Sequence, residues 1–200
     1  RDLRMSRGLG DVYKRQVSVL GNHDYASYAK DTHEAQDRLL RLLVETEQNA
    51  LGWRLLRNDH LVIRRGGDSL VVAGTENDGE PPFPNLADTR KSLEGVRPGA
   101  FVVMLQHDPS AWRRDILPKT TAQLTLSGHT HGGQMQFFGH RPTQWRGRPD
   151  KGLYEQQGRY LYVNAGLGGL VPFRLNMPNE ITVITLRTKH RPADPVAKAN

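Results

Sequence analysis

Short apolar stretches recur along the chain, and each has the length of a β-strand. Side chains of a strand alternate between two faces, or run apolar when both faces are buried. The pattern predicts strands at residues 17–20, 53–56, 61–65, 69–74, 100–105, 124–126, 160–163 and 181–186. These runs are much shorter than the roughly 20 apolar residues that cross a bilayer as a helix.

Residues 31–49 show helical spacing instead. Four leucines between positions 39 and 43 fall on one face of a helix, and polar residues fill the other face. Asp31 is in position to cap the first turn, with Glu34 three residues further on. We therefore predict a helix over residues 31–49. Two shorter helices are predicted at residues 86–93, before Gly95, and at residues 109–116.

Strands and helices are interspersed, without an internal repeat or a low-complexity segment. Prolines in residues 80–84 predict a loop, because proline has no N–H to donate within a central strand. A chain of 200 residues is long enough for one domain with its own core. We therefore predict an α/β (α+β) fold in which helices cover sheets.

The chain has no cysteine, which narrows its metal and redox chemistry. Disulfides, Cys-x-x-Cys redox chemistry and thiolate zinc sites are excluded. Any metal has to be held by His, Asp, Asn or Glu, a set of harder donors that suits ions such as Mn, Fe or Zn.

The formal net charge of +7 leaves an anionic partner open. Five Lys/Arg and only two Asp lie in the first sixteen residues, so much of the surplus is concentrated there. The other basic residues are scattered, and aromatic residues do not interleave with them. A nucleic-acid-binding module therefore has little support, and we expect no specific nucleic-acid binding. Salt-dependent DNA binding without metal would favour that alternative.

The first sixteen residues have no hydrophobic period and no turn pattern. Their last six, Asp-Val-Tyr-Lys-Arg-Gln, back-translate to GAT GTG TAT AAG AGA CAG, a transposon end that is widely used in sequencing adapters. We therefore expect residues 1–16 to be a non-native or disordered leader and residues 17–200 to form part of one domain. An ordinary polar tail is the alternative, and resequencing the locus across the Gln16–Val17 junction separates the two.

Three polar motifs each follow an apolar, strand-like run at its carboxyl end. They are Gly21-Asn22-His23-Asp24, Gln106-His107-Asp108 and Gly128-His129-Thr130-His131. Open α/β sheets present functional groups at such junctions. Imidazoles, an amide oxygen and carboxylates can bind a divalent metal or transfer protons, so the three motifs together predict a site of this kind.

The histidine motifs also have structural interpretations. His129 and His131 lie two residues apart between glycines, so they can point the same way as metal ligands. They can equally be surface histidines of a polar loop. A lone histidine at a strand end, such as His107, is more often structural than a ligand.

The first motif also has both a functional and a structural interpretation. Asn22 can coordinate a metal through its amide oxygen, His23 can donate a proton, and Asp24 can fix the tautomer of an imidazole. Asn and Asp also favour turns for reasons of their own, so a simple capped turn is the alternative.

The three motifs resemble those of the calcineurin-like metallophosphoesterases. That superfamily reads D-x-H, G-D-x-x-D, G-N-H-[DE], a single H and G-H-x-H, and the last three occur here in this order. The longer stretches LSGHTHGGQ, LYVNAGLG and PNEITVITL are similar to the bacterial subgroup that includes YkuE and YaeI. The resemblance covers nearly all of residues 17–200.

The resemblance implies a centre of two divalent ions at the strand ends of a four-layer α-β-β-α sandwich. Asn22, His107 and His129 would bind one ion, and His131 would bind the other. The expected reaction is the hydrolysis of a phosphate ester, either a diester or a monoester. His23 would be the catalytic histidine near the leaving group, with Asp24 orienting it.

Two motifs of the family are not found. D-x-H is absent, and Lys14 stands where the second Asp of G-D-x-x-D belongs. We therefore expect an incomplete sandwich that lacks its N-terminal strands and helices, and a chain that is inactive alone. The alternative is a pseudoenzyme or inactive fragment with a partial metal site. Members of the subgroup are often membrane-associated or exported, so membrane association through the missing region is a further expectation.

Overall fold

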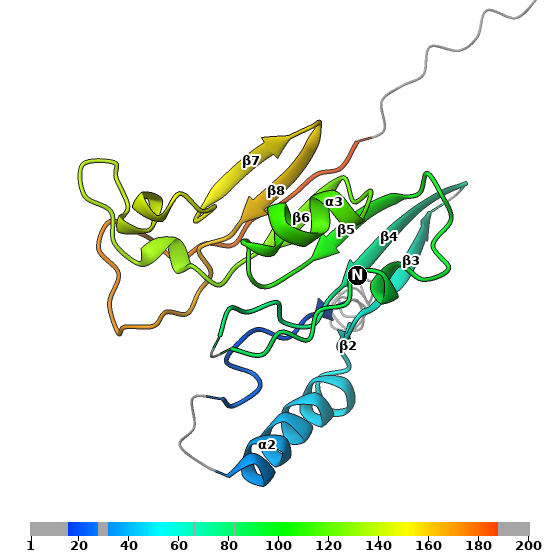
Figure 1. Cartoon of the computed structure of the whole chain (residues 1–200), viewed down its shortest axis with the longest axis horizontal. Helices are drawn as coiled ribbons and strands as arrows, with labels where there is room; N and C mark the ends of the chain where they lie inside the picture. Colours follow the sequence, from blue (N-terminus) through cyan, green and yellow to red (C-terminus); the bar gives the residue numbers. More distant parts are fainter. Residues whose placement is uncertain (1–15, 28–31, 66, 82, 188–200) are drawn as a thin grey trace, which may run out of the picture.

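The computed structural model describes residues 16–27, 32–65, 67–81 and 83–187. The predicted leader, except for Gln16, therefore lies outside the described residues. The described chain is a mixed α/β structure with a six-stranded sheet and few helices (Figure 1). The predicted fold class is confirmed.

Six strands form one mixed sheet in the order β3-β4-β5-β6-β8-β7. The strands are β3 (Asp59–Arg65), β4 (Asp68–Gly74), β5 (Phe101–Leu105), β6 (Leu124–Ser127), β7 (Gly152–Gln156) and β8 (Arg159–Val163). Strands β4, β5, β6 and β8 run parallel, and β3 and β7 pair antiparallel at the two edges. Because parallel strands end at the same edge, the loops after these four strands meet there.

The main core covers one face of this sheet. Alternate residues of β4, β5 and β8 point to that face, where Trp112 and Ile116 lie fully buried against them. The strand residues in this core are Val71, Ala73, Val102, Met104, Leu161 and Val163. Burial of each large apolar side chain contributes about 1.5–3 kcal/mol, so this core fixes the position of the strand ends.

A second sheet pairs β1 (Val17–Ser18) with β2 (Arg54–Leu55) in parallel. Helix α2 (His33–Glu45) connects them and continues into one wider turn, Thr46–Ala50. The helix packs against a small cluster of Leu20, Tyr25 and Leu55. Figure 1 shows α2 standing apart from the six-stranded sheet. No residue of α2 is buried, so the core on this side of the described structure is thin.

The start of α2 differs from the prediction. Thr32 is the N-cap, and its hydroxyl accepts a hydrogen bond from the backbone N–H of Ala35 at 3.3 Å. The predicted cap, Asp31, lies outside the described residues. A threonine oxygen satisfies an N-terminal donor in the same way as a carboxylate, so the cap lies one residue later than expected.

Two predicted helices are shorter than expected. Residues 86–93 form only one 3₁₀ turn, Lys91–Leu93. The carboxylate of Asp88 accepts hydrogen bonds from the backbone N–H groups of Arg90 and Lys91, and such local bonds compete with a helix. The helix predicted at 109–116 forms from Trp112 to Ile116 as one wide turn and continues into α3 (Leu117–Lys119).

The strand predicted at residues 181–186 was wrong. The nearby strand β8 already pairs with β6 and β7, so neither edge of β8 is open to another strand. The segment instead lies beside β8 through side chains: Asn164 Nδ2 donates to Thr182 Oγ1 at 2.8 Å. Strand β7 was not predicted. It pairs with β8 as a hairpin, and the positive φ of Gln157 and Gly158 forms the tight turn between the two strands.

Candidate metal centre

The three polar motifs meet at the carboxyl edge of the parallel strands. His107 comes two residues after β5, and His129 comes two residues after β6. These strands are neighbours, with Leu105 opposite Leu126. Their pairing extends into the motifs, because the backbone N–H of Gly128 donates to the His107 carbonyl at 3.1 Å. Asn22 reaches the same place from the other side, after β1.

Three donor atoms from these motifs form a small triangle. Asn22 Oδ1 lies 2.8 Å from His107 Nε2 and 3.2 Å from His129 Nδ1. The two imidazole nitrogens lie 3.2 Å apart. Nitrogen and oxygen ligands bind zinc-like ions at about 2.0–2.2 Å, so ligands of one ion stand about 3 Å from one another. The triangle therefore fits three ligands of a single divalent ion.

Electrostatics favour the metal-binding form of both imidazoles. Burial, assisted by the nearby His129, lowers the pKa of His107 to about 4. Burial also lowers the pKa of His129, against the opposing effect of the Asp108 carboxylate, which lies 3.9 Å from His129 Nε2. Both rings are therefore neutral near pH 7, the form in which imidazole binds a metal.

His131 lies near the triangle without completing a second one. Burial lowers its pKa most, followed by the charges of Arg174, His129 and His23. Within the described part of the chain, no group of three or more His, Cys, Asp or Glu side chains has the arrangement of a metal site. The triangle, with its amide, is thus a partial set of ligands that lacks carboxylates.

His23 and Asp24 occupy the turn that carries Asn22. His23 is exposed, and its charge is among the causes that lower the pKa of His107, His129 and His131. The Asp24 carboxylate accepts a hydrogen bond from the backbone N–H of Gly21 at 2.7 Å. Asp24 therefore closes the turn. The predicted catalytic roles of His23 and Asp24 remain predictions.

Gly21 gives His107 the space that it needs. A Cβ atom at position 21 would lie 2.7 Å from Nδ1 and from Cε1 of His107. Real Cβ contacts do not come this close, so any other residue would displace the ring. The glycine at the start of the first motif is thus explained by packing against the second.

Tyr25 anchors the first motif to the large sheet, a role that the sequence analysis missed. Its hydroxyl donates to Glu76 Oε2 at 2.7 Å and accepts from the backbone N–H of Asn77 at 3.1 Å. Arg57 Nε donates to the other oxygen of Glu76 at 2.9 Å. Burial raises the pKa of Tyr25. The signal in the sequence was an aromatic residue directly after the motif.

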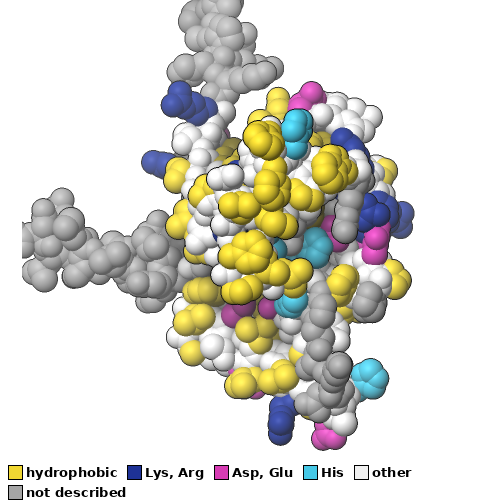
Figure 2. Space-filling view, turned by 90° about the vertical axis from the view of Figure 1, so that its left-hand side faces the viewer, with side chains coloured by type: hydrophobic (Ala, Val, Ile, Leu, Met, Phe, Trp, Pro, Cys, Tyr) yellow, Lys and Arg dark blue, Asp and Glu magenta, His cyan; other side chains and the backbone are white. Residues whose placement is uncertain are grey.

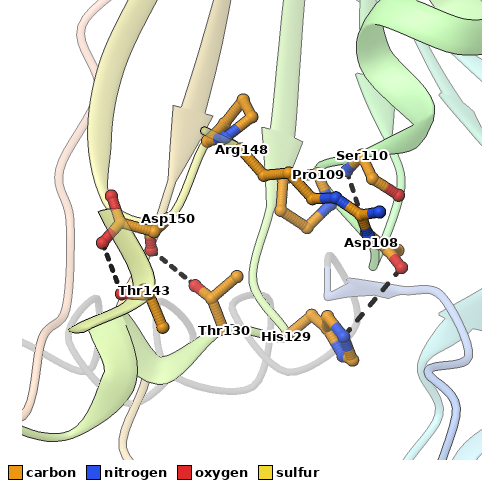
Figure 3. A pocket seen from close by; sticks show the side chains of 9 residues that line it. Asp108, Pro109, Ser110, His129, Thr130, Thr143, Arg148 and Asp150 are labelled. Atoms are coloured by element: carbon orange, nitrogen blue, oxygen red, sulfur yellow. Dashed lines mark hydrogen bonds and ion pairs between the residues drawn. The ribbon is translucent and has the colours of Figure 1, made fainter. Parts of the chain in front are cut away.

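Asp150 anchors the third motif and was also missed. The Thr130 hydroxyl, between the two histidines, donates to the Asp150 carbonyl (Figure 3). The buried carboxylate of Asp150 accepts from Arg141 Nε at 2.8 Å and from the Thr143 hydroxyl at 2.6 Å, and from the hydroxyl of Tyr154 at 3.0 Å. Burial raises the pKa of this carboxyl, but these donors outweigh burial and hold the pKa below its ordinary value.

Gln134 joins two loops next to the histidines. Its side chain donates to the carbonyls of Val171 and Phe173 at 2.9 and 2.8 Å. These loops expose several large apolar side chains, and Figure 2 shows such side chains spread over this face of the molecule. They include Phe138, Trp145, Leu167 and Leu170. The candidate centre thus lies among apolar loops.

A pocket of about 190 Å³ lies beside His129 (Figure 3). It is lined by Asp108, Pro109, Ser110, His129, Thr130, Thr143, Arg148, Pro149 and Asp150. A substrate that reaches the triangle can extend into this pocket.

No helix in the described ranges has the length and apolarity needed to span a bilayer.

Comparison with known proteins agrees with the motifs. No protein-family model matches the chain. An uncharacterized metallophosphoesterase of Aquifex aeolicus is 31% identical over 178 residues, which are 87% of this chain and 61% of that protein. The uncharacterized metallophosphoesterase YkuE of Bacillus subtilis is 30% identical over 183 residues, which are 86% of this chain and 56% of YkuE. A transmembrane protein with metallophosphoesterase domain from Bos taurus is 30% identical over 176 residues, 84% of this chain and 38% of that protein.

The chain spans only 61% and 56% of the first two relatives. The similarity nevertheless extends over more than four fifths of this chain in all three comparisons, and all three names contain the same activity class. The chain therefore belongs to the metallophosphoesterase family.

Proposed function

We propose that the full-length protein hydrolyses a phosphate ester, a diester or a monoester, at a centre of two divalent ions such as Mn, Fe or Zn. The observation that carries the proposal is the triangle of Asn22 Oδ1, His107 Nε2 and His129 Nδ1. These three residues would hold one ion, and His131 would hold the other. Bound there, the ions would polarise the phosphoryl oxygens and lower the pKa of water.

The residues of the first motif have separate tasks in the proposed reaction. His23, exposed on its turn, donates a proton from its imidazole to the leaving oxygen. Asp24 keeps His23 in place, because its carboxylate closes the turn on the N–H of Gly21. Tyr25 holds the turn on Glu76 of the large sheet. The turn is therefore fixed on both sides of the proton donor.

We further propose that a segment upstream of residues 17–200 completes the centre. The family motifs D-x-H and G-D-x-x-D would supply an Asp, a His and a bridging Asp there. Two observations support this: the chain spans 61% and 56% of two relatives, and Leu39 and Leu42 of α2 are 45% and 59% exposed. The same segment would carry any membrane association, an idea supported by the name of the Bos taurus relative.

One observation favours a second candidate function, that of an inactive fragment or pseudoenzyme. Among the described residues the ligand set is neutral and incomplete. Two divalent ions close together need carboxylates to offset their charge, because the cations otherwise repel each other. The 200-residue chain alone is therefore expected to bind metal weakly and to be inactive.

Measurements on the 200-residue chain and on the full-length protein test both candidates. After loading with Mn²⁺ and gel filtration, elemental analysis gives the metal content, and bis(4-nitrophenyl) phosphate and 4-nitrophenyl phosphate report hydrolysis. The full-length protein is expected to retain two ions and to hydrolyse at least one ester, and the short chain is expected to do neither. A full-length protein that retains metal but hydrolyses neither ester would support the pseudoenzyme.

A further inference from the structure

The pocket beside His129 has one cationic side chain among the residues that line it, Arg148. In Figure 3, Arg148 reaches across the pocket from the side of Asp150 toward Pro109. At about 190 Å³, the pocket is smaller than the roughly 300–1,000 Å³ of a site for a drug-sized ligand. It therefore suits one small group rather than a nucleobase or an acyl chain.

Apart from the Ser110 hydroxyl, which is buried without a hydrogen-bond partner, the other charged and hydroxyl groups of the pocket are already engaged. The Asp150 carboxylate is neutralised by Arg141, and Thr143 and Thr130 donate to Asp150. Asp108 accepts from the backbone N–H of Ser110 at 2.8 Å and faces His129. A ligand in the pocket cannot use the engaged groups without breaking their bonds. Arg148 is therefore the charged group best placed to recognise an anion, and the Ser110 hydroxyl can donate a further hydrogen bond.

Arg148 is only weakly held in its present position. Its Nη2 atom lies 3.0 Å from Oε1 of Glu80, and the two side chains are 56% and 53% exposed. An exposed ion pair contributes little, because water and salt screen it. A phosphate can accept two parallel hydrogen bonds from a guanidinium, and such charge-assisted bonds are stronger than a screened surface contact. An incoming phosphate can therefore displace Glu80.

We propose that Arg148 binds a second phosphate of the substrate, next to the scissile one, so that phosphoanhydride esters are preferred over diesters with uncharged substituents. The inference rests on the proposed function and specifies its substrate class. Glu80 is the resting partner of Arg148 and is not needed when the substrate is bound.

The test compares two substrates of the full-length, Mn²⁺-loaded protein. Bis(4-nitrophenyl) phosphate has no second phosphate, whereas ADP-glucose carries one beside the scissile phosphorus. In Arg148→Gln, kcat/KM for ADP-glucose is expected to fall about 10- to 100-fold, mainly through KM, which is the range for a lost charge-assisted pair. The value for bis(4-nitrophenyl) phosphate is expected to change less than about twofold. Arg148→Lys recovers only part of the loss, because an ammonium cannot form the two parallel bonds.

Glu80→Gln is the matched control, since it removes the same ion pair and leaves the guanidinium. It is expected to leave kcat/KM for ADP-glucose unchanged or raised. Equal losses for both substrates in Arg148→Gln, or an ADP-glucose loss in Glu80→Gln that matches it, would overturn the inference and leave the proposed function intact. Absence of hydrolysis of both substrates by the unaltered protein would overturn the proposed function itself, and with it the inference.

Discussion

The Nε2 atom of His107 lies 2.8 Å from the amide oxygen of Asn22, although 85 positions separate the two residues. His129 joins them from a third segment, with its Nδ1 atom 3.2 Å from both atoms. Three loops from two sheets thus bring their donor atoms to one point.

Removal of one donor is expected to weaken metal binding severely. A change to a residue that only supports a metal ligand lowers metal affinity by about 10- to 100-fold. Asn22→Ala and His129→Ala in the full-length protein should each lower Mn²⁺ affinity by more than that. Equilibrium dialysis with elemental analysis measures the affinity. His140→Ala, at an exposed histidine, is the control and should leave it unchanged. Unaltered affinity in both ligand variants would remove the basis of the proposed centre.

His23 is expected to act on turnover and not on metal content. His23→Ala should lower kcat by about 10²- to 10⁴-fold, the usual contribution of a general acid. The loss should be smaller for 4-nitrophenyl esters than for alkyl esters, because nitrophenolate leaves without protonation. Steady-state kinetics on both ester types and elemental analysis of the same samples check this. Normal turnover of alkyl esters by the variant would show that the assigned role is wrong.

Gly21→Ala is expected to disturb the ring of His107, because the new Cβ atom would lie 2.7 Å from it. The cost to folding should be about 1–3 kcal/mol, as for other overpacked sites, and metal affinity should fall with it. Urea denaturation and equilibrium dialysis measure the two effects. Gly128→Ala is the matched control, since no atom lies within 4 Å of its Cβ position. Two variants of equal stability would contradict the packing argument.

Tyr25→Phe tests the anchor of the first motif. The change leaves Glu76 and the N–H of Asn77 without their shared partner, which should cost about 1–3 kcal/mol of unfolding free energy. Chemical denaturation provides the value. Tyr160→Phe, at a ring that is 43% exposed, should change stability by less than about 0.5 kcal/mol. A Tyr25→Phe protein as stable as the control would show that the anchor contributes nothing.

Asp150 is expected to link stability to acidic pH. Its folded-state pKa lies below the ordinary value of about 3.9, so the carboxylate stabilises the fold fully above that value. The stabilisation is lost as pH falls from about 4 through the lower folded-state pKa. Asp150→Asn should therefore cost about 1.5–3 kcal/mol at pH 7 and progressively less toward pH 3. Unfolding free energies across this range check the trend, with the exposed Asp37→Asn as control. A difference that does not shrink at low pH would contradict it.

Local patterns in the sequence were enough to place most strands. The core strands at 69–74, 100–105, 124–126 and 160–163 were found within one or two residues, because their apolar runs are short-range features. Residues 181–186 have the same pattern and form no strand, since β8 has partners on both sides. Whether a run of apolar residues pairs depends on which sheet edge remains open, and that is decided by the whole fold.

The sequence by itself determined the residue types and their order: an amide, histidines and carboxylates after strand-like runs, in the order that the metallophosphoesterases share. Only the tertiary structure decided that Asn22, His107 and His129 meet within about 3 Å, and that Tyr25 and Asp150 hold their loops. The reason is physical. Residue type and hydrophobic periodicity are properties of residues that are close together in the sequence. Contacts across 85 or 107 positions depend instead on strand order and register, and burial of the common core selects both.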